Sequence, residues 1–147
     1  MSERHFLSLG DAIIERLRER LPEGVDVEPS PDIDAAAEVS GSRPTIRVIY
    51  DGYQTGTGPM IEIQQTWLVV LVLRNTAQVG TGSAAFDEGG RLATQVIRAL
   101  HRWRPAGHML LSLTGSRFTP GYQGGRLFLP LAFTSTFKET ANADQAD

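Results

Sequence analysis

Residues 60–74, Met-Ile-Glu-Ile-Gln-Gln-Thr-Trp-Leu-Val-Val-Leu-Val-Leu-Arg, decide the fold. In the first half of this stretch apolar and polar residues alternate, so that Ile61 and Ile63 lie on one side of the chain and polar residues on the other. This pattern is typical of a strand with one face in water. The second half, residues 67–73, is apolar at every position, which is typical of a strand buried on both faces. Such a sheet needs cover on both sides. We expect the chain's own helices to cover one side, and a neighbouring subunit is a candidate cover for the other.

Two amphipathic helices flank this stretch. Residues 8–21 repeat leucine and isoleucine about every four residues, and Pro22 with Gly24 ends the pattern. Residues 84–104 carry an apolar stripe of the same period, which stops before Pro105. The sequence therefore predicts two helices, each with one apolar and one solvated face.

Two further strands are predicted on the N-terminal side. Residues 25–28 and 43–50 alternate apolar and polar side chains. The segments that follow them, residues 29–42 and 51–59, are rich in Pro, Gly, Ser and Asp, and we expect both to be exposed loops.

Two closing strands, residues 109–118 and 127–138, are predicted on the C-terminal side, joined by a glycine-rich turn. Pro130 cannot donate a hydrogen bond to a neighbouring strand, so it places the second of these strands at an edge or at a bulge. Residues 141–147 are polar, and we expect a disordered C-terminal tail there.

The order of the elements predicts an α+β fold. It should contain a mixed, mostly antiparallel sheet of four to five strands, with the two helices packed together on one face. The chain has 147 residues, which suits one domain. We therefore expect residues 1–140 to form a single α+β domain.

The composition narrows the class of function. The formal net charge is -3, so there is no overall basic field of the kind that neutralises nucleic-acid phosphates. The chain has no cysteine, which excludes disulfides, thiolate metal sites and thiol catalysis. Its longest apolar run is far below the roughly 20 residues of a membrane-spanning helix, and the N-terminus lacks the pattern of a secretory signal. We expect a cytoplasmic protein that does not attach to a membrane.

The best enzyme-like motif is Gly-Thr-Gly-Ser at residues 80–83, before the second predicted helix. Backbone amides at a helix N-terminus attract anions. However, the motif lacks the lysine of a phosphate-binding loop, and Asp87 and Glu88 would repel a phosphate. We interpret the motif as a helix cap.

Two other patterns fall short of a metal site. Asp32 and Asp34 resemble half of a calcium loop whose glycine and bidentate glutamate are missing. The three histidines, His5, His101 and His108, are far apart and lack metal-ligand spacing. We therefore expect no catalytic residue, no metal and no cofactor, and hence no enzyme.

Arginine dominates the basic residues, since Lys138 is the only lysine among 14 lysine and arginine residues. Arginine is favoured at protein interfaces, where its planar group binds carboxylates through two hydrogen bonds. A codon bias in the host genome explains the same excess, and arginines late in a helix also complement its dipole.

A tryptophan is a core anchor if buried and an interface anchor if exposed. The possible interface residues are Arg16, Arg20, Tyr53, Trp67, Arg98, Arg102 and Trp103.

Several segments, taken together, resemble a known protein family. They are Pro-Thr-Ile-Arg-Val-Ile-Tyr-Asp-Gly-Tyr at residues 44–53, Gln-Thr-Trp-Leu-Val-Val at residues 65–70, Arg-Asn at residues 74–75, residues 92–100 followed by Trp103 and Pro105, and Gly-Tyr at residues 121–122. In their order and spacing, over roughly residues 9–138, they resemble the tail terminator, or tail completion, proteins of Mu-like and related long-tailed phages and prophages.

The resemblance implies a structural role. Such proteins form a ring, typically of six subunits, at the head-proximal end of the tail tube. The ring stops tube polymerisation and offers a surface to the head connector. The implied partners are further copies of the chain, the tail tube protein and the head connector or neck protein. DNA passes through the lumen without specific binding, and the protein ends in the virion tail after assembly in the host cytoplasm.

Two alternatives stay open at this stage. The first is another phage neck or minor tail protein, such as a head–tail joining subunit. The second, from a different class, is a small ligand- or nucleotide-binding enzyme. The family resemblance supplies no catalytic residue to this chain.

Overall fold

The computed structural model describes residues 5–38, 41 and 43–139. The element order is α1 (Ser8–Arg20), β1 (Asp26–Pro29), α2 (Ile33–Ala37), β2 (Thr45–Thr55), β3 (Ile61–Arg74), α3 (Ser83–Leu100), β4 (Ser112–Thr114), β5 (Gly121–Gln123) and β6 (Arg126–Glu139). The predicted α+β class is confirmed. Within the described part of the chain there are six strands and three helices, compared with the four to five strands and two helices that the sequence led us to expect. The predicted disordered tail, residues 141–147, lies outside the described residues.

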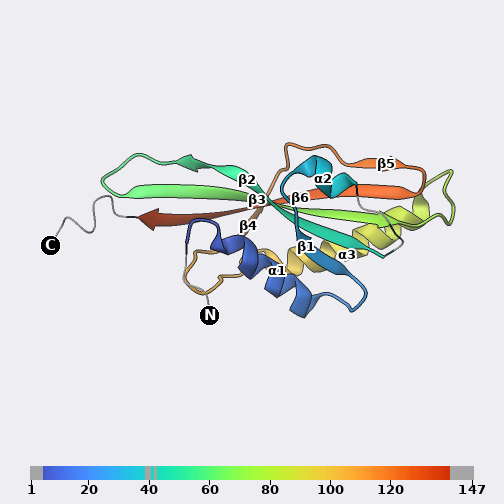
Figure 1. Ribbon diagram of the computed structural model, residues 1–147, viewed down its shortest axis with the longest axis horizontal. Coiled ribbons are helices and arrows are strands. Elements are labelled where there is room, and N and C mark those ends of the chain that lie inside the picture. The colour runs from blue at the N-terminus through green and yellow to red at the C-terminus, as the bar shows by residue number, and fades with distance from the viewer. Residues whose placement is uncertain (1–4, 39–40, 42, 140–147) are drawn as a thin grey trace.

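The strands form one mixed sheet in the order β1-β2-β3-β6-β4, with β5 also pairing with β6. β1 runs parallel to β2, and the other described pairs are antiparallel. β3 and β6 pair along their whole length, from Ile61 opposite Glu139 to Arg74 opposite Arg126. These two long strands run along the length of an elongated molecule (Figure 1).

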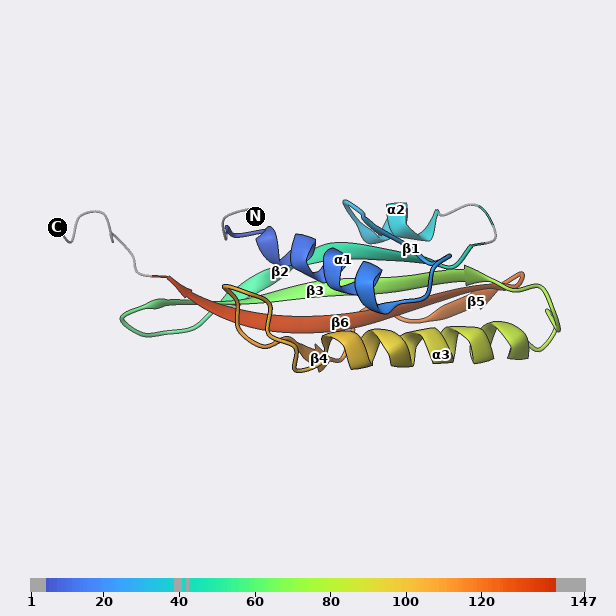
Figure 2. The ribbon, with the colours of Figure 1, turned by 90° about the horizontal axis from the view of Figure 1, so that it is seen from below.

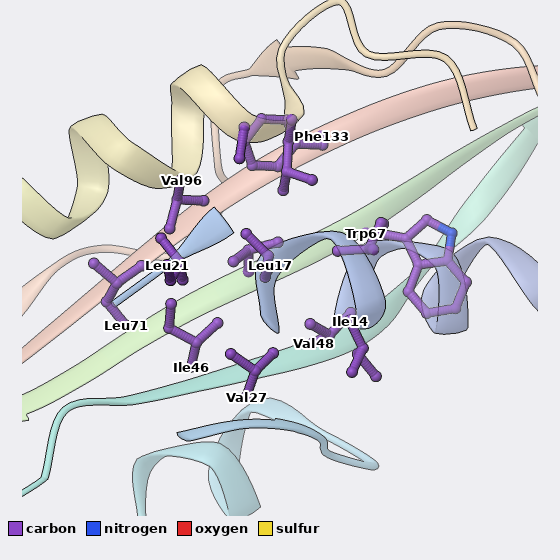
Figure 3. Close-up of a cluster of buried hydrophobic side chains, with 14 of the residues drawn as sticks. Ile14, Leu17, Leu21, Val27, Ile46, Val48, Trp67, Leu71, Val96 and Phe133 are labelled. Atoms are coloured by element: carbon purple, nitrogen blue, oxygen red, sulfur yellow. The ribbon is translucent and has the colours of Figure 1, made fainter. Parts of the chain in front are cut away.

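The two predicted helices, α1 and α3, pack on the same face of the sheet (Figures 1 and 2). We call this the helix-covered face. The main core lies between these helices and the sheet, and Figure 3 shows its interlocking side chains. The core includes Leu17, Leu21, Val27, Ile46, Val48, Trp67, Leu71, Val96 and Phe133.

Both helices approach the sheet closely at a glycine. A Cβ atom on Gly10 would lie 2.6 Å from a ring carbon of Trp67. A Cβ atom on Gly89 would collide with the side chain of Leu127. Any larger residue at either position would push its helix away from the sheet.

The opposite face of the apolar run is covered by the chain itself. Ala36 of α2 packs there against Leu68, Val70 and Val72, which are 3% exposed or less. Phe118 and Phe128 pack against the same cluster. This cover removes our reason for placing a neighbouring subunit on residues 67–73.

The helix α2 lies inside a segment predicted to be a loop. It is capped by Asp32, whose Oδ1 accepts a hydrogen bond from the backbone N–H of Ala35 at 2.8 Å. An aspartate at this position stabilises the first turn of a helix. The prediction of a loop over the whole of residues 29–42 was wrong because this capped helix is only five residues long, too short for a periodic pattern.

Other boundaries also differ from those predicted. β2 continues to Thr55, into the predicted loop, and α3 ends at Leu100. The predicted strand over residues 109–118 is reduced to β4, and β5 lies within the predicted turn. Pro130 lies on β6 between the positions that pair with β4 and those that pair with β5. β6 is therefore a central strand where β4 and β5 pair with it, and it is an edge around Pro130 and beyond Thr134.

Candidate interaction surface

Beyond the helices, β2, β3 and β6 continue as a three-stranded arm at one end of the molecule (Figure 2). The arm consists of residues 51–55, 61–66 and 134–139. In its register, Ile63 lies opposite Thr55 on one side and opposite Phe137 on the other. Among the described elements, no helix packs on the arm. On the arm, the side of the sheet that corresponds to the helix-covered face is therefore accessible to another molecule.

A β-bulge sets which side chains reach this face of the arm. The register of β2 shifts between Tyr50, opposite Trp67, and Tyr53, opposite Gln65. Gly52 lies in the bulge with a φ of 97°, a conformation that glycine adopts without strain. Residues three apart on a regular strand point to opposite faces. Because the bulge inserts one residue, Tyr53 points to the same face as Tyr50.

An aromatic cluster joins the arm to the core. The ring of Phe6 meets the rings of Tyr53, Tyr50 and Phe137 edge to face, with centroids 5.5, 6.0 and 5.9 Å away. Tyr50 in turn packs on Trp67 with centroids 5.1 Å apart. Edge-to-face pairs at these distances are favourable. The segment before α1 is therefore held against the base of the arm.

A buried glutamine fixes this segment in place. Gln65 is 1% exposed, and its side-chain amide donates a hydrogen bond to the carbonyl oxygen of Phe6. Its Oε1 accepts a hydrogen bond from Trp67 Nε1 at 3.2 Å. Both polar ends of the side chain are thus satisfied, as burial requires.

Six exposed apolar side chains belong to the aromatic cluster or lie on the arm and on the segments beside it. Met109 is adjacent because its carbonyl oxygen accepts a hydrogen bond from Ser135 Oγ at 3.1 Å, at the base of the arm. The exposed fractions run from 38% for Phe6 to 56% for Tyr53. A group of exposed apolar side chains is typical of a surface that another molecule covers. We call this set the arm patch: Phe6, Leu7, Tyr53, Ile61, Met109 and Leu110.

The structure disperses the predicted interface residues. Tyr53 belongs to the arm patch, whereas Trp67 is 6% exposed and lies in the core. Arg16 and Trp103 contact each other, because the guanidinium carbon of Arg16 lies 4.9 Å from the ring centroid of Trp103. Arg16 Nε also donates a hydrogen bond to the carbonyl oxygen of Ala99 at 3.0 Å.

The remaining predicted arginines are Arg20, Arg98 and Arg102. All three are exposed, and none forms an ion pair with another described residue. Arg102 has a φ of 64°, and its backbone N–H donates to the carbonyl oxygen of Leu111 at 2.7 Å, which places it near the arm patch. Burial, followed by the nearby charge of Arg20, lowers the pKa of Arg16. Interface roles for these residues stay predictions.

Sequence reasoning missed most of the arm patch. Phe6 and Leu7 lie just before the first predicted helix, and Met109 and Leu110 begin the predicted strand over residues 109–118. None of the four carries a periodic signal of its own. Ile61 did carry a signal. The alternation of apolar and polar residues at the start of residues 60–74 places Ile61 on the apolar face of its strand, and no cover was predicted for that face at Ile61.

The glycine-rich motif before α3 forms no phosphate cradle. Gly82 precedes the first turn, and Ser83 Oγ donates a hydrogen bond to Gln78 Oε1. The neighbouring cavity is lined by two carboxylates, Asp87 and Glu88, together with Arg91. Two carboxylates there disfavour a bound phosphate, which agrees with the interpretation as a helix start.

A larger cavity, of about 590 Å³, lies on the opposite face beside β5. Arg74 and Arg126 line it, with Tyr122, Phe128 and Ala37. Among the described residues, neither a carboxylate nor a histidine lines this cavity. Elsewhere in residues 5–38, 41 and 43–139, no three His, Asp or Glu side chains come together as a metal site would require. None of the described helices has the length and apolar character needed to span a membrane.

Comparison with known families gives one match. A family model described as phage tail terminator protein matches residues 4–143, which is nearly the whole chain. No curated protein matches the chain.

Proposed function

The chain belongs to the phage tail terminator protein family, and from this premise we propose that its copies form a closed ring that caps the tail tube and joins it to the head. Family membership makes it a structural protein of the phage tail. We expect a hexamer that assembles in the host cytoplasm and stays in the virion tail. Its partners are further copies, the tail tube protein and the head connector or neck protein. DNA passes through the lumen without specific binding, and the protein catalyses no reaction.

The arm patch is the observation that carries this proposal. Most apolar side chains elsewhere on the sheet are buried by the chain's own helices and loops, whereas Tyr53 and Ile61 stay 56% and 39% exposed. A stable protein interface buries at least about 1,000 Å² and places aromatic side chains near its centre. The arm patch offers aromatic rings on a rigid, three-stranded support.

A ring also requires a particular kind of contact. When a surface on one subunit meets a different surface on the next, the chain of contacts closes if the rotation between subunits completes a circle. A closed ring has no free end to which further subunits can add. Bound to the end of a polymerising tube, such a ring stops growth, which is the action that the proposed function requires.

The length of tail tubes tests this proposal. Tube subunits are polymerised alone and with increasing amounts of this protein, and tube lengths are measured by electron microscopy. We expect a shorter mean length that depends on the ratio of the two proteins. Lengths that do not change at any ratio would refute the proposed function.

A matched pair of variants makes the test specific. Ile61→Glu places a charge in the arm patch, and Gln64→Glu places the same charge on the other face of the same strand, at an exposed position. We expect Ile61→Glu to lose capping and Gln64→Glu to retain it. Equal capping by both variants would show that the arm patch plays no part.

A further inference from the structure

A second exposed apolar group lies at the other end of the molecule, where α3 begins. Phe86 is 51% exposed and Val79 is 45% exposed. The ring of Phe86 packs on that of Tyr122 with centroids 5.4 Å apart, and Tyr122 Oη donates a hydrogen bond to the carbonyl oxygen of Val79 at 2.7 Å. We call these three residues the end patch: Val79, Phe86 and Tyr122.

The two patches occupy the same face of one rigid sheet. Tyr122 lies opposite Leu127, which packs with Ala85 of α3. The aromatic cluster of the arm lies on the same face at Phe137. Ten residues of β6 separate Leu127 from Phe137, which corresponds to roughly 33 Å along a strand. One subunit therefore cannot bring its own two patches together, and a different molecule must cover each.

The charges beside the two patches have opposite signs. Asp87 follows Phe86 directly, is exposed and forms no ion pair with a described residue, and Glu88 lies next to it ahead of Arg91. Beside Met109 and Leu110 of the arm patch, Arg102 and Arg104 are exposed and have no carboxylate partner among the described residues. Complementary charges at the rim of an interface steer its formation and fix its register.

We propose that the arm patch of one subunit packs on the end patch of the next, so that each joint in the assembly is head-to-tail. This inference rests on the proposed ring, because it identifies the two surfaces that form each contact. Packing the arm patch on its own copy would bring Arg102 and Arg104 against the same arginines. Packing it on the end patch places those arginines beside Asp87 and joins aromatic rings on both sides.

A cysteine cross-linking experiment tests the joint directly. The chain has no native cysteine, so each introduced thiol reports one position. Thr55→Cys lies on the arm, and Thr81→Cys lies in the turn before Phe86; both positions are exposed and belong to neither patch. The two single variants, one carrying an affinity tag, are mixed and treated with a short bis-maleimide.

We expect a cross-linked dimer that contains one tagged and one untagged subunit, and no dimer from either variant alone. A dimer formed by one variant alone would show that a patch packs on its own copy and would overturn the inference. Absence of the mixed dimer, when sedimentation shows that the same mixture forms rings, would also overturn it. In that outcome the proposed ring would stand. If neither rings nor tube capping are found, the proposed function itself fails.

Charge reversal gives an independent test. We expect Asp87→Arg to weaken association about tenfold, in line with the effect of losing a complementary charge at an interface. Arg102→Asp with Arg104→Asp should weaken it similarly. Mixing the Asp87→Arg chain with the Arg102→Asp, Arg104→Asp chain would leave some joints with like charges. All three substitutions are therefore combined in one chain, which restores opposite charges at every head-to-tail joint. Recovery of association supports the joint, and additive weakening contradicts it.

Discussion

The two halves of β3 pair with the same neighbouring strands, β2 and β6, but have different surroundings. Residues 67–73 are buried on both faces, by α1 and α3 on one side and by α2 with Phe118 on the other. Residues 61–66 all pair with β6, and Ile63, Gln64 and Gln65 also pair with β2. On the helix-covered face, the part of the chain that the structure describes covers them with the segment around Phe6. One half of the strand therefore stabilises the subunit, and the other half is available to a partner.

The largest expected effect separates the two halves by their contribution to stability. Leu71 is fully buried, and truncation to Ala leaves a cavity, so we expect Leu71→Ala to lower the free energy of unfolding by about 2–5 kcal/mol. Ile61 is 39% exposed, and Ile61→Ala should change that free energy by less than about 0.5 kcal/mol. Urea denaturation of dilute protein measures both. Similar losses for the two variants would contradict the division of β3 into two halves.

A smaller effect is expected where the two halves meet. Gln65→Leu leaves the carbonyl oxygen of Phe6 and the indole N–H of Trp67 without their present partners. An unsatisfied buried polar group costs about 1–3 kcal/mol, and we expect a loss of this size, with a change in tryptophan fluorescence as Phe6 detaches. Gln64→Leu, one residue away and exposed on the other face, is the control and should be nearly neutral. A neutral Gln65→Leu variant would show that the segment around Phe6 is not anchored here.

The smallest effect concerns Tyr50, whose buried hydroxyl has no hydrogen-bond partner among the residues that the structure describes. Burial, followed by the nearby Tyr53, raises the pKa of Tyr50 above its ordinary value of about 10. The unfolded chain therefore loses this proton first. The contribution to stability is present below about pH 10 and is lost as the pH rises through the folded-state pKa.

We expect Tyr50→Phe to leave the free energy of unfolding nearly unchanged at pH 7, because no hydrogen bond is removed. Above pH 10 the variant should lose less stability than the parent chain. Denaturation curves at neutral pH and at several values above pH 10 measure the difference. The same decline in both proteins would show that Tyr50 does not contribute to it.

The sequence predicted much of the fold because its main signals are local. The alternation at Ile61 and Ile63, the apolar run after it and the two amphipathic helices all depend on the spacing of neighbouring residues. The cover of Leu68 by α2 and Phe118 was not predictable, because it depends on segments far apart in the chain. A five-residue helix capped by Asp32 gives too short a pattern to detect.

The arm patch was only partly predictable for the same reason. Tyr53 was a candidate interface residue, but Phe6, which it contacts, and Phe137, which contacts Phe6, lie towards the two ends of the chain. A usable signal was present in Gly52, since an isolated glycine within a strand pattern often marks a bulge. Reading the segment around Gly52 as a bulged strand would have placed Tyr50 and Tyr53 on one face and extended the sheet into the arm.

Sedimentation velocity over a concentration series tests most directly whether the arm patch holds subunits together. The parent chain and Gln64→Glu should both shift, as the concentration rises, from a single subunit to one discrete larger species. Ile61→Glu should remain a folded single subunit over the same range. Association of Ile61→Glu equal to that of the parent chain, or a parent chain that stays a single subunit with tail tubes present, would contradict the account.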